Sequence, residues 1–440
     1  MRKVLIFTYY WPPSGGPGVQ RFLKFCKFLG AAGWEPIVVT VRNGGYPSLD
    51  PSLEQEIPEH LVVHKTETFE PFELYNLLRG KKGKSIPVAM MGIKDSSSPF
   101  QRLARYVRAN FFIPDARKGW VPYAVREARK LLKAEPVEAV ITTGPPHSTH
   151  LIGRALKQAH GLPWIADFRD PWTTIYYNRF LPRSARSKVK DQALEDAVLR
   201  EADGVVVVSE GLKQEFADRA ANIRVIYNGY DQVDLEGEDA PDAPPHFTLA
   251  YIGNLKPNQN PPGLWQALSA LVGRDKDFAR DFRLKLTGNA DPFVLEDIRK
   301  AGLADHLEVE GYLPHKEATR AMRQAAMLLF LIPESPKNHL ILTGKLFEYL
   351  ASGTPMLSVG PVEGNAARIV AEAGRDPMSA YADQEAMQEQ VLHYYRHWVE
   401  AKGQAFRFEL SPQVTRFSRQ EQARALGQFL DTVTLESSSS

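Results

Sequence analysis

The sequence predicts an α/β protein with two doubly wound parallel sheets that face each other across a cleft. Two observations lead to this class. Short β-branched runs alternate with helical patterns along most of the 440 residues, as parallel sheets with crossover helices require. An acidic, proline-rich stretch interrupts the alternation near the middle of the chain, and the alternation then restarts. A chain of this length is expected to form two or three domains.

The first strand–helix–strand unit sets the pattern for the N-terminal half. Residues 4–9 are predicted to form a strand, 12–18 a loop rich in glycine and proline, and the apolar stripe that includes Cys26 the buried face of a helix. Further elements are expected as strands at 36–41, 139–143, 164–167, 204–209 and 224–227, and as a helix at 188–201.

The second half restarts the alternation. Strands are expected at 247–252, 283–287, 307–309, 327–332 and 356–359, and helices at 262–272, 292–301, 316–325, 344–352 and 365–373. The predicted division is an N-terminal domain at 1–230, a linker at 231–246, a C-terminal domain at 247–390, and helices with a disordered tail at 391–440.

Composition excludes several classes of protein. Lys plus Arg number 54 and Asp plus Glu 52, so the net charge of +2 gives no electrostatic case for binding nucleic acid. The single cysteine, Cys26, excludes a disulfide framework and a cysteine-based zinc site. The longest apolar stretch, 325–333, is far shorter than the ~20 residues of a membrane-spanning helix. We expect a cytoplasmic protein, soluble or peripheral to the membrane.

The region 65–125 fits the alternation poorly. Within it, residues 100–112 predict an amphipathic helix with apolar residues on one face and arginines on the other. Such a helix either packs on its own domain or lies on an anionic membrane surface. Both interpretations stay open.

Three loops of the N-terminal half carry candidate binding residues, because ligands of doubly wound sheets bind beyond the carboxyl ends of the strands. Glycines 15 and 16 open the first helix, where backbone amides can approach a diphosphate or sugar; a tight turn without a ligand is the alternative. His147 follows the strand at 139–143. Asp167, Arg169 and Asp170 lie at the end of the next strand and either contact an acceptor or only fix their loop.

The second half adds two loops. Gly253 ends the strand at 247–252 and could let the backbone pass close to a phosphate. Thr343 is a plausible N-cap that would aim the amides of Gly344 and Lys345 at an anion, with the lysine ammonium adding charge. Glu348 lies one turn further and suits a ribose diol, to which a carboxylate can accept two hydrogen bonds.

The order of these motifs resembles that of GT-B-fold glycosyltransferases, closest to family 4 (glycosyl transferases group 1). The resemblance spans nearly the whole chain. It rests on the glycine loop, the His147 loop, Tyr227-Asn228-Gly229-Tyr230-Asp231, Tyr251-Ile252-Gly253, Val309-Glu310-Gly311-Tyr312-Leu313-Pro314, and Lys345-Leu346-Phe347-Glu348-Tyr349 followed by Gly353-Thr354-Pro355.

The resemblance implies two Rossmann-like domains, with a nucleotide-sugar donor held mostly by the C-terminal domain and an acceptor by the N-terminal one. Glu348 would bind the donor ribose, Thr343 and Gly344 would contact the diphosphate or sugar, and the stretch Tyr312–Leu313 would contact the base. Gly16 would approach the donor phosphates, and His147 would face the transferred sugar. The resemblance implies no essential metal ion or other cofactor, and the sequence shows no metal-ligand spacing.

Two departures from the family pattern concern catalysis. The family has paired glutamates eight residues apart, and here the earlier position is Leu340. The family's Arg and Lys after the second-domain glycine fall on Asn254 and Gln259, which leaves Lys256 and Lys345 as the nearest cations for a departing diphosphate.

The sequence therefore predicts a transferase that moves a sugar from a nucleotide-sugar donor to a cell-envelope or surface-polysaccharide acceptor, which is either a glycan or lipid-linked. If it follows the family, it retains anomeric configuration. Two alternatives remain: a nucleotide-sugar epimerase of the same fold, and a nucleotide-sugar-binding partner without catalytic activity.

Overall fold

The computed structural model describes residues 1–70, 99–175, 178, 180–235 and 245–438. The chain forms two compact units. The first comprises 1–228 together with 419–440, and the second comprises 229–418. Each unit contains one sheet whose strands are all parallel, so the predicted class of two doubly wound α/β domains is confirmed. The middle of the predicted linker, 236–244, lies outside the described residues.

The sheet of the first unit has the strand order β3-β2-β1-β4-β5-β6-β7. Its strands are β1 (Arg2–Phe7), β2 (Trp34–Val41), β3 (Val62–Thr66), β4 (Ala139–Gly144), β5 (Trp164–Phe168), β6 (Gly204–Val207) and β7 (Ile223–Val225). The order reverses direction between β1 and β4, and the loops that follow these two strands diverge at that point. In doubly wound sheets such a divergence is where ligands bind.

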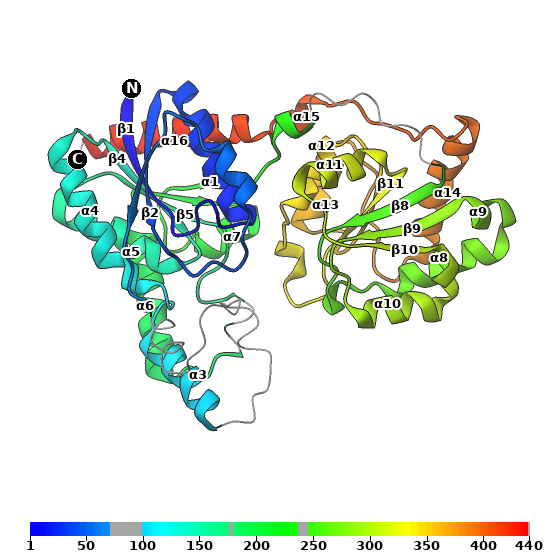
Figure 1. The fold of residues 1–440 in the computed structure, drawn as a ribbon, viewed down its shortest axis with the longest axis horizontal. Coiled ribbons are helices and arrows are strands. Elements are labelled where there is room, and N and C mark those ends of the chain that lie inside the picture. Colours follow the sequence, from blue (N-terminus) through cyan, green and yellow to red (C-terminus); the bar gives the residue numbers. More distant parts are fainter. Residues whose placement is uncertain (71–98, 176–177, 179, 236–244, 439–440) are drawn as a thin grey trace. The chain divides into compact units, whose positions relative to one another are not determined.

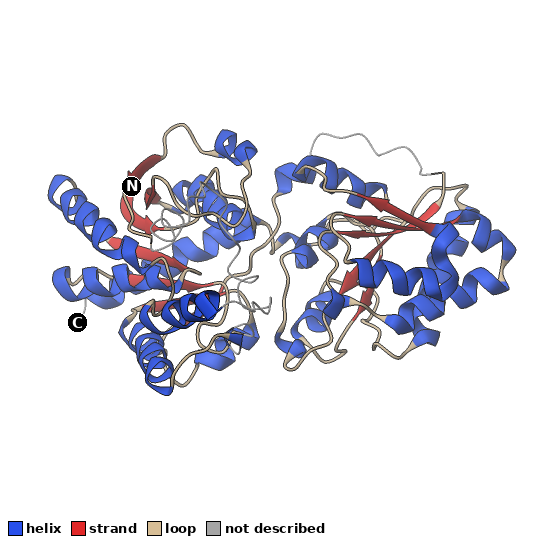
Figure 2. Ribbon diagram, turned by 60° about the horizontal axis from the view of Figure 1, so that its bottom comes forward, coloured by secondary structure: helices blue, strands red, loops and turns tan. Residues whose placement is uncertain are grey.

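Helices cover both faces of this sheet, as Figures 1 and 2 show. They are α1 (Pro17–Phe28), α4 (Val121–Ala134), α5 (His150–His160), α6 (Ala185–Glu201), α7 (Glu210–Phe216) and α16 (Arg419–Ser438). Helix α3 (Pro99–Phe111) lies away from the sheet and contacts α6. Strand β1 supplies both cores. Val4 and Ile6 pack in the cluster beneath α1 and α16, while Leu5 and Phe7 pack in the cluster beneath α4 and α5. A strand buried on both faces explains the unbroken apolar run that predicted it.

The sheet of the second unit has the order β10-β9-β8-β11-β12. Its strands are β8 (Phe247–Ile252), β9 (Phe282–Thr287), β10 (Leu307–Glu310), β11 (Met327–Leu331) and β12 (Met356–Val359). Its helices are α8 (Pro262–Arg274), α9 (Lys276–Asp281), α10 (Pro292–Ile298), α11 (His315–Gln324), α12 (Lys345–Ala351), α13 (Asn365–Glu372), α14 (Gln384–Glu400) and α15 (Pro412–Thr415). Here the reversal lies between β8 and β11, beside the start of α12.

The C-terminal region differs from the predicted run of helices in one respect. Helix α14 belongs to the second unit, whereas α16 packs against α1 of the first. Helix α16 also continues to Ser438, further than the predicted disordered end. No helix among the described residues has both the length and the hydropathy needed to cross a bilayer.

Candidate functional site

The glycine loop after β1 is fastened to the segment that follows β2. The amide of Gly15 donates to the carbonyl of Ser48 at 3.0 Å, and the amide of Asp50 donates to the carbonyl of Pro13 at 2.8 Å. Gly15 therefore has no free amide for a ligand. Gly16 has φ of 111°, and a Cβ placed there would meet nothing within 4 Å. Of the two predicted glycines, Gly16 is the one whose backbone is open to a ligand.

Asp167 forms a buried ion pair that the sequence did not reveal. One of its carboxylate oxygens accepts from Nη2 and Nε of Arg21 at 2.7 and 3.2 Å, and the other accepts from the hydroxyl of Thr143 at 2.8 Å. Asp167 and Arg21 are each 1% exposed. Arg21 also donates to the carbonyl of Tyr227 at 2.8 Å. Asp167 thus positions α1 and the segment after β7, which favours the interpretation that it fixes its loop.

Arg169 and Asp170 remain available at the end of β5. Nε of Arg169 donates to the carbonyl of Gly144 at 3.2 Å, and a Cβ on Gly18 would lie 1.2 Å from Nη1 of Arg169. The guanidinium therefore lies against the first turn of α1, beside Gly16. Asp170 is half-buried, and burial raises the pKa of its carboxyl although Arg169 opposes the shift. Its carboxyl makes no hydrogen bond with the part of the chain that the structure describes.

His147 lies in a box of aromatic rings. Its imidazole stacks on Trp172 with centroids 5.1 Å apart and 7° between the planes, and Phe168 and His150 flank it. Burial, followed by the charge of Arg169, lowers the pKa of His147 to about 3. The carbonyl of Pro171 is close to the ring, but neither ring nitrogen is in a well-formed hydrogen bond. At neutral pH His147 is a neutral imidazole with hydrogen-bonding capacity to spare.

His150 supports this box and was missed at the sequence level. Its Nδ1 lies 2.9 Å from the hydroxyl of Thr142, which also accepts from Nε1 of Trp164 at 2.8 Å. Burial, His147 and Arg169 all lower the pKa of His150. The repetition of histidine at 147 and 150 was the available signal, because a spacing of three places both on one side of a helical turn.

In the second unit, Lys345 meets Tyr251 and Gly253 at the end of β8. Nζ of Lys345 lies 4.0 Å from the ring centroid of Tyr251, and a Cβ on Gly253 would lie 2.7 Å from the same nitrogen. Gly253 has φ of 127°, so glycine is needed there both for the backbone and for the lysine. The hydroxyl of Tyr349 accepts from the amide of Ile252 at 3.0 Å and fixes α12 against the strand end.

The ammonium of Lys345 is an incompletely compensated cation. Its pKa is lowered to about 8: burial is the main cause, Glu348 opposes the shift, and Lys256 adds to it. Lys345 forms no ion pair with any described residue. Lys256 and Glu348 are near enough to act on it, so the two predicted replacement cations do meet at one place. Burying an ammonium without a bonded carboxylate costs free energy, and a bound anion would reduce that cost.

The start of α12 corrects one prediction. Gly344 is at the N-cap position, and the hydroxyl of Thr343 is buried without a hydrogen-bond partner and caps nothing. The first amide of this turn that is bonded is that of Leu346, which donates to the carbonyl of Thr343 at 3.2 Å. The amides of Gly344 and Lys345 make no hydrogen bond within the described residues.

The remaining second-unit residues lie on loops at the same edge of the sheet. Tyr312, just after β10, is 77% exposed, and Leu313 is half-buried. Leu340 ends a 3-10 turn (Asn338–Leu340) and is half-buried. Asn254 and Gln259, at the positions of the family's cations, stabilise the loop after β8. The carbonyl of Asn254 accepts from the hydroxyl of Tyr251 at 3.1 Å, and Oε1 of Gln259 accepts from the amide of Lys256 at 3.4 Å.

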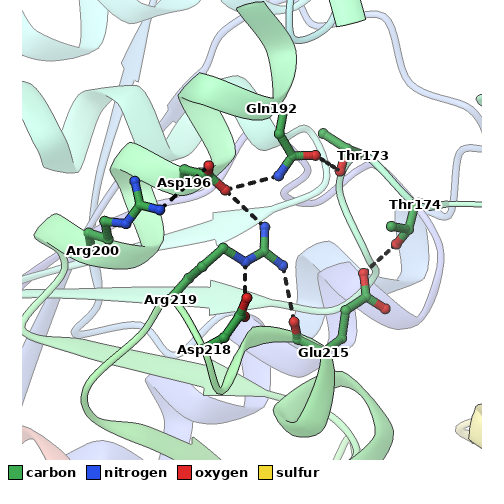
Figure 3. A pocket seen from close by; sticks show the side chains of 8 residues that line it. All are labelled: Thr173, Thr174, Gln192, Asp196, Arg200, Glu215, Asp218 and Arg219. Atoms are coloured by element: carbon green, nitrogen blue, oxygen red, sulfur yellow. Dashed lines mark hydrogen bonds and ion pairs between the residues drawn. The ribbon is translucent and has the colours of Figure 1, made fainter. Parts of the chain in front are cut away.

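A polar hollow of about 380 Å³ lies beyond the loop after β5, between α6 and α7 (Figure 3). Arg219 is at its centre and donates to Asp196 at 3.0 Å, to Asp218 at 3.2 Å and to the carbonyl of Glu215 at 3.0 Å. Thr173 and Thr174 are bonded to the same network. Since its polar groups satisfy one another, we interpret this network as an anchor for the loop that carries Arg169 and Asp170. Within the described residues no group of three or more His, Cys, Asp and Glu could hold a metal ion.

Comparison with known proteins shows which family the N-terminal half resembles. Residues 18–233 match the family described as Glycosyltransferase Family 4. The matched residues include Arg21, His147, Arg169 and Asp170, whereas the cluster around Lys345 lies beyond them. No curated protein matches the sequence.

Solved structures show that the whole chain has the GT-B fold of glycosyltransferases. It is similar to sucrose-phosphate synthase from Thermosynechococcus elongatus, with 15% identity, a TM-score of 0.53, and coverage of 99% of this chain and 97% of that one. It is also similar to the N-terminal domain of trehalose-6-phosphate phosphatase from Candida albicans, with 11% identity, a TM-score of 0.63, and coverage of 98% and 97%. A third similar structure is a variant of TarM from S. aureus in complex with Fondaparinux, α-GlcNAc-glycerol and UDP, with 10% identity, a TM-score of 0.53, and coverage of 99% of each chain.

Proposed function

We propose that this protein transfers a sugar from a nucleotide-sugar donor to a glycan or lipid-linked acceptor of the cell envelope, at the cytoplasmic face of the membrane. The observation that carries the proposal is the convergence of Lys345, Lys256 and Glu348 beside Gly253 at the end of β8. An unpaired, partly buried ammonium next to free amides is the chemistry that binds a diphosphate.

The donor would lie along the C-terminal edge of the second sheet. Its diphosphate would bind Lys345 and the amides of Gly344 and Lys345, with Lys256 adding charge from the loop after β8. The carboxylate of Glu348 would accept from the ribose hydroxyls, and the exposed ring of Tyr312 would stack on the base. The buried hydroxyl of Thr343, which has no partner, would turn to a phosphate or sugar oxygen. The similar TarM structure contains UDP, which supports a nucleotide as a ligand.

The acceptor would bind at the first unit. Neutral His147 can exchange hydrogen bonds with sugar hydroxyls without adding charge, and half-buried Asp170 can orient an acceptor hydroxyl. If the reaction retains configuration, a phosphate oxygen of the donor takes the proton of the attacking hydroxyl, and the cations stabilise the departing diphosphate.

One observation favours a second candidate, a nucleotide-sugar-binding protein without catalytic activity. Leu340 replaces the first of the family's paired glutamates, and an apolar side chain cannot accept a hydrogen bond from a sugar hydroxyl. Such a protein would keep donor binding and lack turnover.

A panel of nucleotide sugars distinguishes these functions. The purified protein is incubated with UDP-, GDP- and ADP-sugars, and the products are separated by chromatography. Release of nucleoside diphosphate, slow with water and faster with an acceptor glycan, is the expected result. Interconversion of sugars would establish an epimerase instead. Binding without any turnover would contradict transfer and support the second candidate.

The ribose contact has its own test. We expect Glu348→Gln to weaken binding of the preferred nucleotide about tenfold, because a charged acceptor of two hydrogen bonds is lost. Glu385→Gln, an exposed glutamate of α14, is the matched control and should leave the affinity unchanged. Equal affinities for wild type and Glu348→Gln would exclude the ribose role.

A further inference from the structure

Helix α3 exposes large apolar side chains that an ordinary surface helix would bury against its own domain. Three of its large apolar side chains face solvent: Tyr106 is 47% exposed, Val107 38% and Phe111 65%. The helix is attached to the first unit through Asn110 instead. Its side chain donates to the carbonyl of Pro182 at 2.9 Å and accepts from the amide of Ser184 at 2.7 Å. The apolar face that predicted a helix packed on its own domain is therefore left uncovered by the rest of the described chain.

Exposed apolar residues continue in the neighbouring segment 180–190, which includes the start of α6, and Figure 1 shows α3 beside α6. Phe180, just before α6, is 40% exposed, and Val189, within it, is 70% exposed. The exposed apolar residues therefore come from two segments that the hydrogen bonds of Asn110 join.

This surface carries an excess of cations. Residues 99–119 and 180–190 contain nine Lys or Arg and a single acid, Asp115, whose oxygens accept from the amide and hydroxyl of Ser148, each at 2.8 Å. Two of the nine pair with carboxylates outside these ranges, Arg117 with Glu70 and Arg183 with Asp191. Arg102, Arg186 and Lys188 are exposed and form no ion pair with the described residues.

The cations are close enough to repel one another. Burial and Lys190 lower the pKa of Lys118, and Asp115 opposes the shift. A protein surface that gathers more lysines and arginines than carboxylates near exposed aromatic rings gains most from an anionic partner with an apolar interior.

We propose that this α3–α6 surface, made of Arg102, Tyr106, Phe111, Arg186, Lys188 and Val189, docks on an anionic lipid bilayer. Exposed Tyr and Phe side chains insert at the level of the headgroups, and Lys and Arg pair with acidic headgroups while their stems lie along the apolar surface. An acidic protein partner would satisfy the cations but would not explain isolated rings spread among them.

The docking surface is joined to the acceptor side by four residues of chain. After Phe111 the backbone reaches Asp115, whose carboxylate holds Ser148 next to His147. Docking would therefore bring the His147 loop close to the membrane, where a lipid-linked acceptor is presented. The docking itself does not depend on the sugar-transfer proposal.

Vesicle flotation tests the surface without any donor or acceptor. The full chain is mixed with vesicles of phosphatidylcholine alone, or of phosphatidylcholine with phosphatidylglycerol. We expect flotation with the anionic vesicles only, weakened by salt. The double variant Arg102→Glu/Lys188→Glu should reduce the partition coefficient about tenfold or more, since each basic residue near an anionic surface contributes measurably. Tyr106→Ser/Phe111→Ser should reduce it at high salt as well, because apolar insertion is not screened.

The matched control is Arg126→Glu/Arg129→Glu, which makes the same change in net charge on two exposed arginines of α4. It should bind vesicles like the wild type. Equal loss in both charge variants would mean that net charge, and not this surface, attracts lipid, and would overturn the proposal. Absence of flotation with anionic vesicles at low salt, or binding to soluble acidic polymers in preference to vesicles, would overturn it too.

Discussion

At the residue scale, the candidate site depends on groups whose charge is set by burial. Lys345 is held under the ring of Tyr251 with a pKa of about 8, and His147 is held among aromatic rings with a pKa of about 3. Both shifts move the group toward its neutral form, as burial of a base does. Near neutral pH the first is still mostly a cation and the second is neutral, so one suits a diphosphate and the other a sugar hydroxyl.

The pKa of Lys345 gives donor binding a pH dependence. A diphosphate binds the protonated amine, so nucleotide affinity should be constant below about pH 8 and should fall above it, up to tenfold per pH unit. Lys345→Arg should keep its charge and hold the affinity at pH 9. Fluorescence titration of the nucleotide at pH 7 and pH 9 measures both. An identical decline in the two proteins would assign the effect to another group.

His147, in contrast to Lys345, should give no pH dependence near neutral pH. Because its pKa lies near 3, the pH profile of kcat/KM should show no inflection from this residue between pH 5 and 8, whereas an exposed histidine would titrate near 6.5. His147→Asn, which keeps neutral hydrogen bonding, should retain the shape of the profile and lower its height. A profile that loses an inflection near pH 6.5 in this variant would show that His147 does titrate.

The sequence predicted His147 because it follows a strand end, and Lys345 and Glu348 because they lie in the first turns of a predicted helix. It could not predict which groups are already engaged. For Asp167 it left both an acceptor contact and a role in fixing the loop open, because its partner Arg21 is 146 residues away and no local pattern reveals such a pairing.

At the element scale, ion pairs fasten the loops to the sheet. The Arg21–Asp167 pair joins α1 to the end of β5, and the Arg219 network joins α7 to α6 and to the loop after β5. These ion pairs fix the positions of the loops that carry the candidate residues. The sequence predicted the elements they connect, yet it missed edge strand β3, which is short and only half-buried, so its apolar signal is weak.

Removing one member of the buried pair should be costly. We expect Arg21→Met to lower the free energy of unfolding of the first unit by about 3–5 kcal/mol, because Asp167 is left as an uncompensated buried charge. Arg200→Met, at an arginine whose side chain is 63% exposed, is the control and should change it by less than about 1 kcal/mol. Urea unfolding measures both. Similar values for the two variants would mean that the pair contributes little.

At the scale of the whole molecule, the chain crosses between its two units twice. It leaves the first unit after Asn228 and returns at Arg419, where α16 packs on α1. The apolar pattern near the C-terminus predicted a helix but not its location, because a stripe of Ala, Leu and Phe fits either core. The alternation of strands and helices, in contrast, predicted both sheets, since each βαβ unit is local in sequence.

Deletion of residues 419–440 tests this arrangement. Helix α16 contributes Ala423, Leu426, Phe429, Leu430 and Val433 to the core of the first unit. The truncated protein should therefore lose hydrogen-exchange protection in β1, β4 and α1, while β8 and β9 of the second unit keep theirs. Uniform loss across both units, or none, would contradict the assignment of α16 to the first unit alone.

The most direct test of the account is calorimetric titration of UDP, GDP and ADP into the wild-type protein and into Lys345→Met at pH 7, with exposed Lys276→Met as the control. We predict that at least one nucleotide binds the wild type and the control equally, and binds Lys345→Met about tenfold to a hundredfold more weakly, as expected for the loss of a charge-assisted hydrogen bond. Undiminished affinity in Lys345→Met, or no binding of any nucleotide to the wild type, would contradict a donor site at the end of β8.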